Sequence, residues 1–183
     1  MAKFQQSRTQ SGVRLLTAIA TLALALSGST YEATSQDAVL PASAQAMTAG
    51  EVHELFSNKS WKWENGAGRM KAEGRRFSAW VDGENDKSWA EGRWLVTKTG
   101  QMCLDATWHS ASGAFPARTC FSHMVDGGTI YQKREPDGKW FVFRHVPPQG
   151  GDEANTLLAT DLVSGRLKDM KAAVGPTMQP SKE

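Results

Sequence analysis

The sequence predicts a mainly β protein: a small antiparallel up-and-down β-barrel or sandwich, with a short N-terminal helix and a further helix near the C-terminus. Between residues 60 and 146, turn signals alternate with short runs rich in aromatic and β-branched residues. No helical pattern lies between these runs, so hairpin connections and antiparallel order are the simplest topology. The turn signals are Asn65-Gly66, Asp82-Gly83, Thr99-Gly100, Asp126-Gly127-Gly128 and Pro136-Asp137-Gly138.

Composition divides the chain into four consecutive parts. One of them is long enough to bury a single hydrophobic core. The flanking parts contain few aromatic residues: the first is largely apolar, and the others are mostly polar. The parts are a signal peptide (1–27), a flexible lead-in (28–46), a β-barrel domain (47–147), and a polar loop followed by a helix and a disordered tail (148–183).

The signal peptide is predicted from a basic start and the uncharged twelve-residue run LLTAIATLALAL (15–26). This run is too short to span a bilayer, which takes about 20 apolar residues. Small residues favour cleavage near Ser27–Ser29, and the alternative is a buried N-terminal helix of a cytosolic protein. We therefore expect a periplasmic or secreted protein that has no membrane span after cleavage.

Cleavage changes the charge of the chain. The signal segment carries three of the 21 Lys and Arg residues and none of the 19 Asp and Glu residues, so 18 cations remain against 19 anions. Nucleic-acid binding needs a basic stripe on the folded domain. We therefore expect no nucleic-acid partner.

The helix that opens the domain is predicted from three features that agree. Thr48 and Glu51 have the spacing of a capping box, and Met47 with Val52 fits a hydrophobic staple around it. Apolar residues then recur at helical spacing. The expected helix covers about 49–57.

Strand alternation assigns faces to the runs that follow. Trp61 and Trp63 share a face that we expect to point inward, and the returning strand of their hairpin is expected to begin after Gly68. Trp89 and Trp94 have opposite parity, so we expect a bulge at Gly92 to bring both to one side. The runs are SWKWE (60–64), RRFSAWV (75–81), KSWAEGRWLVT (87–97), MCLDATWH (102–109), RTCFSHMV (118–125), TIYQKRE (129–135) and KWFVFRHV (139–146).

The C-terminal segment has leucines at helical and near-helical spacing over 156–171. It predicts a helix that is broken around Ser164-Gly165, followed by a disordered end.

Cys103 and Cys120 are the only cysteines. Alternation places each on the face opposite the apolar residues of its own run, as a cross-strand disulfide requires. Disulfides persist in exported proteins, and a loop of this size makes the bridge worth about 3 kcal/mol. A reactive thiol or a metal ligand is the alternative, although no Cys-x-x-Cys pair is present.

Five side chains are candidates for contact with a ligand. Tryptophan rings stack on flat ligands, but they also fill cores, and a core histidine with satisfied hydrogen bonds is the alternative for the single histidine of the set. No metal or cofactor is expected, because the histidines lack zinc-site spacing and no dinucleotide fingerprint is present. The candidates are Trp61, Trp63, Trp108, Phe121 and His123.

Catalysis finds little support in the sequence. No Gly-x-Ser-x-Gly elbow is present. Glu91 is an acid inside a strand, and we expect it to pair with Arg93 or Arg69. An enzyme acting on an envelope polymer would need Glu91 and His123 to meet in a cleft.

The series of motifs resembles the domain-of-unknown-function 995 family, small exported proteins of alpha-proteobacteria. The resemblance covers about 47–143 and implies an exported β domain without an assigned chemistry. A short helix before a Trp-bearing strand is also similar to the calycin barrels, although Lys59 stands where lipocalins have the glycine of Gly-x-Trp. The motifs are the segment 61–68, WAEGRWLV (89–96), GQMCLDATWH (100–109), Cys120 and IYQKREPDGKWFVF (130–143).

These observations predict a non-enzymatic exported barrel that binds a small apolar or glycan-like ligand or an envelope component. Barrels of about eight strands hold one small ligand or fill with side chains. The alternative is therefore a solid-core structural or inhibitory module that binds an envelope protein.

Overall fold

The computed structural model describes residues 37–84 and 87–175. The expected signal peptide, the first part of the lead-in and the C-terminal tail from residue 176 lie outside the described residues.

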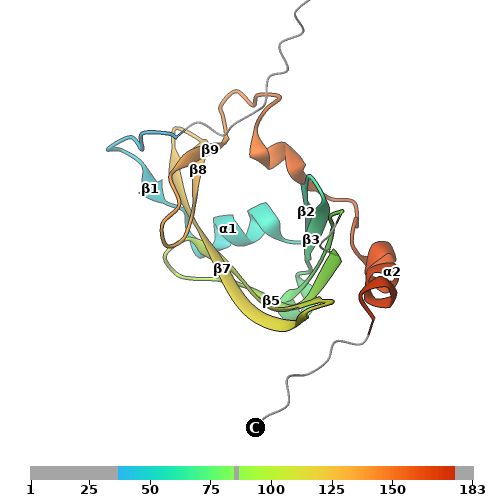
Figure 1. Ribbon diagram of the computed structural model, residues 1–183. Coiled ribbons are helices and arrows are strands. Elements are labelled where there is room, and N and C mark those ends of the chain that lie inside the picture. The colour runs from blue at the N-terminus through green and yellow to red at the C-terminus, as the bar shows by residue number, and fades with distance from the viewer. Residues whose placement is uncertain (1–36, 85–86, 176–183) are drawn as a thin grey trace, which may run out of the picture. The chain divides into compact units, whose positions relative to one another are not determined.

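One curled antiparallel sheet carries the fold and forms half of a barrel (Figure 1). Neighbours in the sheet follow chain order from β2 to β9, β10 joins β2 at one edge, and β1 pairs with β7. The predicted fold class is confirmed, with the barrel left half closed. The strands are β1 (Gln45–Ala46), β2 (Lys59–Trp63), β3 (Gly66–Met70), β4 (Arg76–Asp82), β5 (Lys87–Val96), β6 (Gln101–Ser110), β7 (Gly113–Asp126), β8 (Thr129–Arg134), β9 (Phe141–Arg144) and β10 (Leu157–Leu158).

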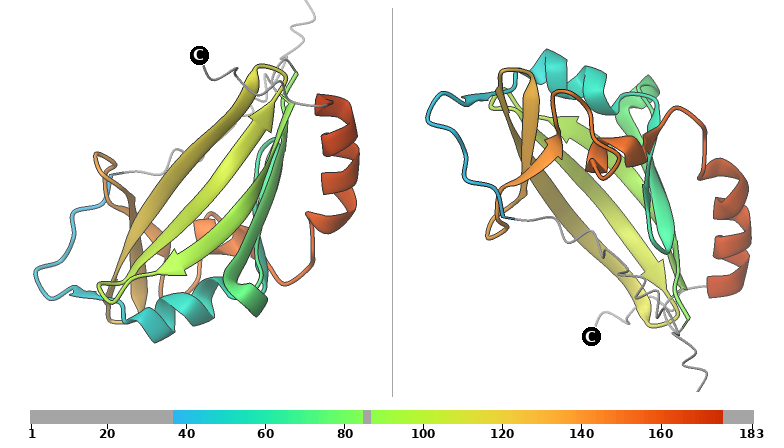
Figure 2. Two further views of the ribbon diagram at one scale, coloured as in Figure 1. Left: turned by 90° about the horizontal axis from the view of Figure 1, so that it is seen from below. Right: turned by 90° about the horizontal axis from the view of Figure 1, so that it is seen from above.

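The helix α1 (Ala49–Phe56) lies across one end of the half-barrel, inside the curve of the sheet (Figures 1 and 2). The predicted capping box is present: the backbone N–H of Thr48 donates to Glu51 Oε2 at 2.7 Å, and the N–H of Glu51 donates to Thr48 Oγ1 at 3.3 Å. Val52 and Phe56 are fully buried. The helix therefore closes this end of the core.

Strand β3 begins at Gly66, directly after the hairpin turn, rather than after Gly68 as expected. Glycine has low strand propensity, so the pattern hides this strand. Position 66 requires glycine because the backbone of β4 approaches it closely: a Cβ on Gly66 would lie 2.2 Å from the carbonyl oxygen of Trp80.

The expected bulge at Gly92 is wrong. Gly92 pairs in regular register with Phe77 on β4 and Ala106 on β6, so Trp89 and Trp94 lie on opposite faces of the sheet. A Cβ at position 92 would lie 2.2 Å from the carbonyl oxygen of Asp105. Glycine therefore permits close packing of the backbone here without interrupting the ladder.

Cys103 and Cys120 face each other in the register of β6 and β7 and form the predicted disulfide. Met102, the neighbour of Cys103, points to the concave side and is fully buried in the core cluster. The bridge thus lies on the side of the sheet opposite α1.

The C-terminal part closes the gap between the two sheet edges and then crosses to the outer face. The short 3-10 helix η2 (Glu153–Thr156) contacts β2, β9 and β10. Helix α2 (Ser164–Val174) packs on β4 and β5, outside the curve of the sheet (Figure 2).

Ser164 and Gly165 start this helix; the predicted break at that point is wrong. Asp161 explains the start, because its Oδ1 accepts hydrogen bonds from the backbone N–H groups of Val163 and Ser164 at 3.0 and 2.9 Å.

The sheet extends beyond the expected domain limits 47–147 at both ends, because it includes β1 and β10.

Candidate functional site

Trp61, Phe121 and His123 converge in the packed core. The ring of Trp61 contacts Phe121 with centroids 5.1 Å apart, and it contacts Phe56 of α1 at 5.7 Å. Its Nε1 donates to Glu153 Oε1 at 2.7 Å. Trp61 therefore ties η2 to β2 and fills the α1 end of the half-barrel.

His123 is a buried and neutral member of this core. A carbonyl oxygen only accepts, so Nδ1 carries the hydrogen and donates to Gly100 at 3.2 Å, while Nε2 accepts from Gln132 Nε2 at 2.8 Å. Burial lowers the pKa of His123 to about 4, against a smaller opposite effect of the Gly100 carbonyl. Both ring nitrogens are engaged by protein groups.

Trp63 and Trp108 stay partly exposed on the concave face, each packed on one side against the core cluster. The indole of Trp63 lies along two glycines of β3: a Cβ on Gly66 would be 2.3 Å from its Nε1, and a Cβ on Gly68 would be 3.0 Å from its Cη2. Trp108 pairs with Ala90 on β5. Small residues thus make room for the large rings.

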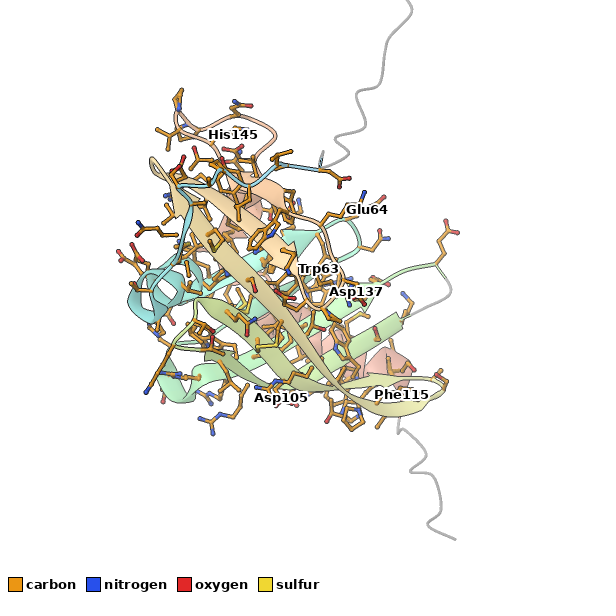
Figure 3. The ribbon with its side chains drawn as sticks, turned by 90° about the vertical axis from the view of Figure 1, so that its left-hand side faces the viewer. Trp63, Glu64, Asp105, Phe115, Asp137 and His145 are labelled. Atoms are coloured by element: carbon orange, nitrogen blue, oxygen red, sulfur yellow. A yellow bond between two sulfur atoms is a disulfide. The ribbon has the colours of Figure 1, made fainter. Side chains whose placement is uncertain are left out.

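A groove beside the β2–β3 hairpin is the strongest candidate site. We call it the hairpin groove. It has a volume of about 420 Å³, within the range of small-molecule sites. Figure 3 shows Trp63 beside Glu64 at this hairpin, away from Phe115. The groove is lined by Lys62, Trp63, Glu64, Gly66, Ala67, Trp80, Leu158, Leu162 and Arg166.

The far wall of the hairpin groove is the segment 158–166, which Arg69 of β3 holds in place. Its Nη1 donates to the carbonyl oxygens of Ala159 and Thr160 at 3.1 and 3.2 Å, and its Nε lies 3.4 Å from Asp161 Oδ2. Trp80 adds a second tie, because its Nε1 donates to the carbonyl oxygen of Leu162 at 2.9 Å. The wall is therefore fixed by hydrogen bonds to the sheet.

Charge at the groove comes from both sides of its rim. Arg166 lies over the ring of Trp80 at 5.0 Å and pairs with Asp82 at 2.7 Å. Lys87 pairs with the same carboxylate, and its hydrogen bond is the largest cause that holds the pKa of Asp82 below its usual value. Within 37–84 and 87–175, neither Lys62 nor Glu64 forms an ion pair.

Only Trp63 of the five sequence candidates lines this groove, although its ring lies on the concave face. Trp80 belongs to the predicted strand run 75–81, but the pattern of that run did not indicate that Trp80 contacts a ligand. A segment about 100 residues further along the chain supplies the other wall, through Leu158, Leu162 and Arg166. The sequence of this segment predicted only a helix. No sequence pattern indicates that this segment returns to the hairpin.

Glu91 and His123 do not meet. Glu91 lies on the outer face, where its carboxylate pairs with Lys171 of α2 at 2.8 Å rather than with Arg93 or Arg69. His123 is buried on the concave side. The sheet therefore separates the two groups that a polymer-cleaving site would need.

An acid–histidine pair, Asp152 with His145, holds the loop after β9. His145 Nδ1 lies 2.5 Å from Asp152 Oδ1, and Asp152 Oδ2 accepts the N–H groups of His145 and Gln149 at 3.0 and 2.9 Å. Burial raises the pKa of Asp152, but these hydrogen bonds outweigh it and leave the pKa below its usual value. The carboxylate thus organises the loop.

The described residues contain no group of three or more His, Cys, Asp or Glu side chains placed to hold a metal ion. None of the helices in this part of the chain is long and apolar enough to cross a membrane.

Comparison with known proteins identifies a family. Residues 23–163 match the family described as protein of unknown function (DUF995). No curated protein and no solved structure matches the chain. Since the match covers well over half of the sequence, the chain belongs to the DUF995 family.

Proposed function

We propose that the protein is an exported, non-enzymatic binding protein that holds a small ligand with an apolar body in the hairpin groove. The observation that carries the proposal is the lining of this groove, which combines the ring of Trp80 and two leucines with charged groups at the rim. Apolar walls with a few placed polar groups are typical of small-molecule sites.

The packing of the concave side favours the hairpin groove over the interior of the half-barrel. Trp61, Phe121 and His123 are in mutual contact with α1 or with each other, so they fill the space near the helix. Leu158 of the groove, by contrast, keeps 36% of its surface exposed. An exposed leucine at the mouth of an apolar groove is a ready contact for a ligand.

Export is supported by the composition of residues 1–27 and by the disulfide between Cys103 and Cys120. Disulfides form and persist mainly in oxidising compartments. Cell fractionation followed by mass measurement with and without reduction tests this part. Recovery from the cytosol with two free thiols would contradict export.

Titration calorimetry with dodecyl maltoside and with maltose tests binding, because the first offers an alkyl chain and the second only the sugar. We expect the alkyl ligand to bind and Leu158→Ala to weaken it by about tenfold, the effect of a few lost methylene contacts. Val146→Ala is the matched control, since Val146 is also an exposed aliphatic residue, 57% exposed, outside the groove.

Binding of neither ligand, nor of any anionic alkyl ligand, would favour the solid-core interaction module instead. Equal losses in the Leu158 and Val146 variants would place the ligand elsewhere.

A further inference from the structure

We infer that the ligand of the hairpin groove is a single-chain amphiphile with an acidic headgroup, of which a free fatty acid is the simplest form. This inference rests on the proposed function and specifies its ligand. It follows from three features of the groove: the way its aromatic rings are presented, the balance of charge on its rim, and the position of its exposed leucine.

Neither tryptophan at the groove presents an open ring face for stacking on a sugar. Arg166 covers one face of the Trp80 ring at 5.0 Å, and the Nε1 of the same ring is engaged by Leu162. The Trp63 ring lies along Gly66 and Gly68 on the concave face, on the side of the sheet opposite Trp80. Sugar recognition uses an open ring face, whereas an alkyl chain packs equally well against ring edges and leucine methyls.

The charge on the rim favours an anion. Two cations, Lys62 and Arg166, line the groove against one carboxylate, Glu64. Arg166 is not neutralised by its partner, because Asp82 is shared with Lys87 and one carboxylate serves two cations. The groove and its adjoining ion pairs therefore carry one net positive charge.

Lys62 is the group best placed to receive the headgroup. Its ammonium makes no ion pair or hydrogen bond with the residues that the structure describes, and the residue itself is exposed. A guanidinium retains free N–H donors when a single nitrogen pairs with a carboxylate, so Arg166 can add a second contact. An acidic group between the two would complete the charge balance of the rim.

The groove offers apolar side chains to an alkyl chain on two sides. Leu158 and Leu162 form one wall, and the side chains of Ala67 and Trp80 form the outer face of the sheet opposite them. Burial of each methylene contributes about fourfold in affinity. A single chain of moderate length is therefore enough for specific binding in a groove of about 420 Å³.

Titration calorimetry of the full exported chain with dodecanoate, below its micelle concentration, tests the inference against dodecyl maltoside and maltose. We expect dodecanoate to bind most tightly, Lys62→Gln to weaken it by about fivefold, and the same variant to leave dodecyl maltoside unchanged. Decanoate, two methylenes shorter, is expected to bind about 15-fold more weakly. Dodecyl phosphate shows whether a phosphate replaces the carboxylate.

Lys59→Gln is the matched control. Lys59 lies on the same strand, also forms no ion pair with a described residue, and does not line the hairpin groove. Its replacement should leave the affinity for dodecanoate unchanged, and melting curves of both variants should match that of the parent protein.

The outcomes separate the inference from the proposed function. Equal affinity for dodecanoate and dodecyl maltoside in the parent and in Lys62→Gln would overturn the acidic headgroup and leave ligand binding intact. Binding of maltose alone would overturn the alkyl chain. Binding of none of the alkyl ligands would overturn both proposals, and equal losses in Lys59→Gln and Lys62→Gln would show unspecific attraction of anions.

Discussion

The two helices pack on opposite faces of one sheet by different means. α1 inserts the fully buried Phe56 among aromatic rings, with centroids 5.3 Å from His123 and 6.0 Å from Phe143. α2 buries only Met170 within its length and otherwise places cations over indole rings. Packing of apolar surface dominates folding stability, whereas exposed charge contacts add little. The α1 side is thus the structural core, and the α2 side contributes much less to it.

The largest expected effect concerns α1. Phe56→Ala should lower the free energy of unfolding by about 3–5 kcal/mol, because it leaves a cavity among three aromatic groups. Leu167→Ala on α2 should cost less than about 1 kcal/mol, since this leucine is only half-buried. Urea unfolding measures both, and equal costs would abolish the distinction between the helices.

Acid should act on the two sides in different pH ranges. The pKa of buried His123 falls from 6.5 to about 4 on folding, so the folded state disfavours its protonation. Its contribution to stability is therefore complete above pH 6.5 and is lost as the pH falls to 4. At 1.36 kcal/mol per pKa unit this amounts to about 3 kcal/mol.

Asp161, at the start of α2, acts at lower pH. Burial raises its pKa, but hydrogen bonds from Ser164 and Val163 and the charge of Arg69 outweigh this and lower the pKa from 3.8 to about 2. The stability that it contributes is present above pH 3.8 and disappears as the pH falls to 2.

Urea unfolding between pH 7 and pH 2 separates the two groups. His123→Gln should flatten the curve between pH 6.5 and 4, and Asp161→Asn should flatten it between pH 3.8 and 2. Asp105→Asn is the control, since Asp105 is exposed and forms no ion pair with a described residue. Unchanged slopes in the first two variants would show that the buried network and the helix start are not formed in solution.

The smallest expected effect is at the far end of α2. Lys171 lies 4.5 Å from the ring centroid of Trp89 and 2.8 Å from Glu91, and it is partly exposed. Lys171→Ala should cost about 0.5–1 kcal/mol at low salt and less at 1 M salt, where such charges are screened. Lys168→Ala, on an exposed position of the same helix, should have no effect. A salt-independent loss for Lys171 would indicate apolar packing instead.

The sequence correctly predicted several features that depend on residue spacing within one element or between adjacent elements. The capping box of Thr48 and Glu51, the up-and-down strand order and the facing of Cys103 and Cys120 all follow from spacing within one or two elements. The errors at Gly92 and at Ser164 arose where a residue has a partner that alternation does not reveal. At Gly92 the close approach of a neighbouring backbone decided the outcome, and at Ser164 it was the carboxylate of Asp161, three residues earlier in the chain, whose capping role the leucine spacing does not show.

The candidate site was predicted only in part, for the same physical reason. Local periodicity determines which side chains of a strand share a face, and so Trp61 and Trp63 point to the concave side as the alternation indicates. Whether a ring lines a space or fills one depends on what packs against it. α1 packs against Trp61 on the concave face, while on the outer face the segment 158–166, anchored by Arg69, leaves a groove beside Trp80. Contacts between residues roughly 100 positions apart are set by the collapse of the whole chain, because no interaction within a single element specifies them.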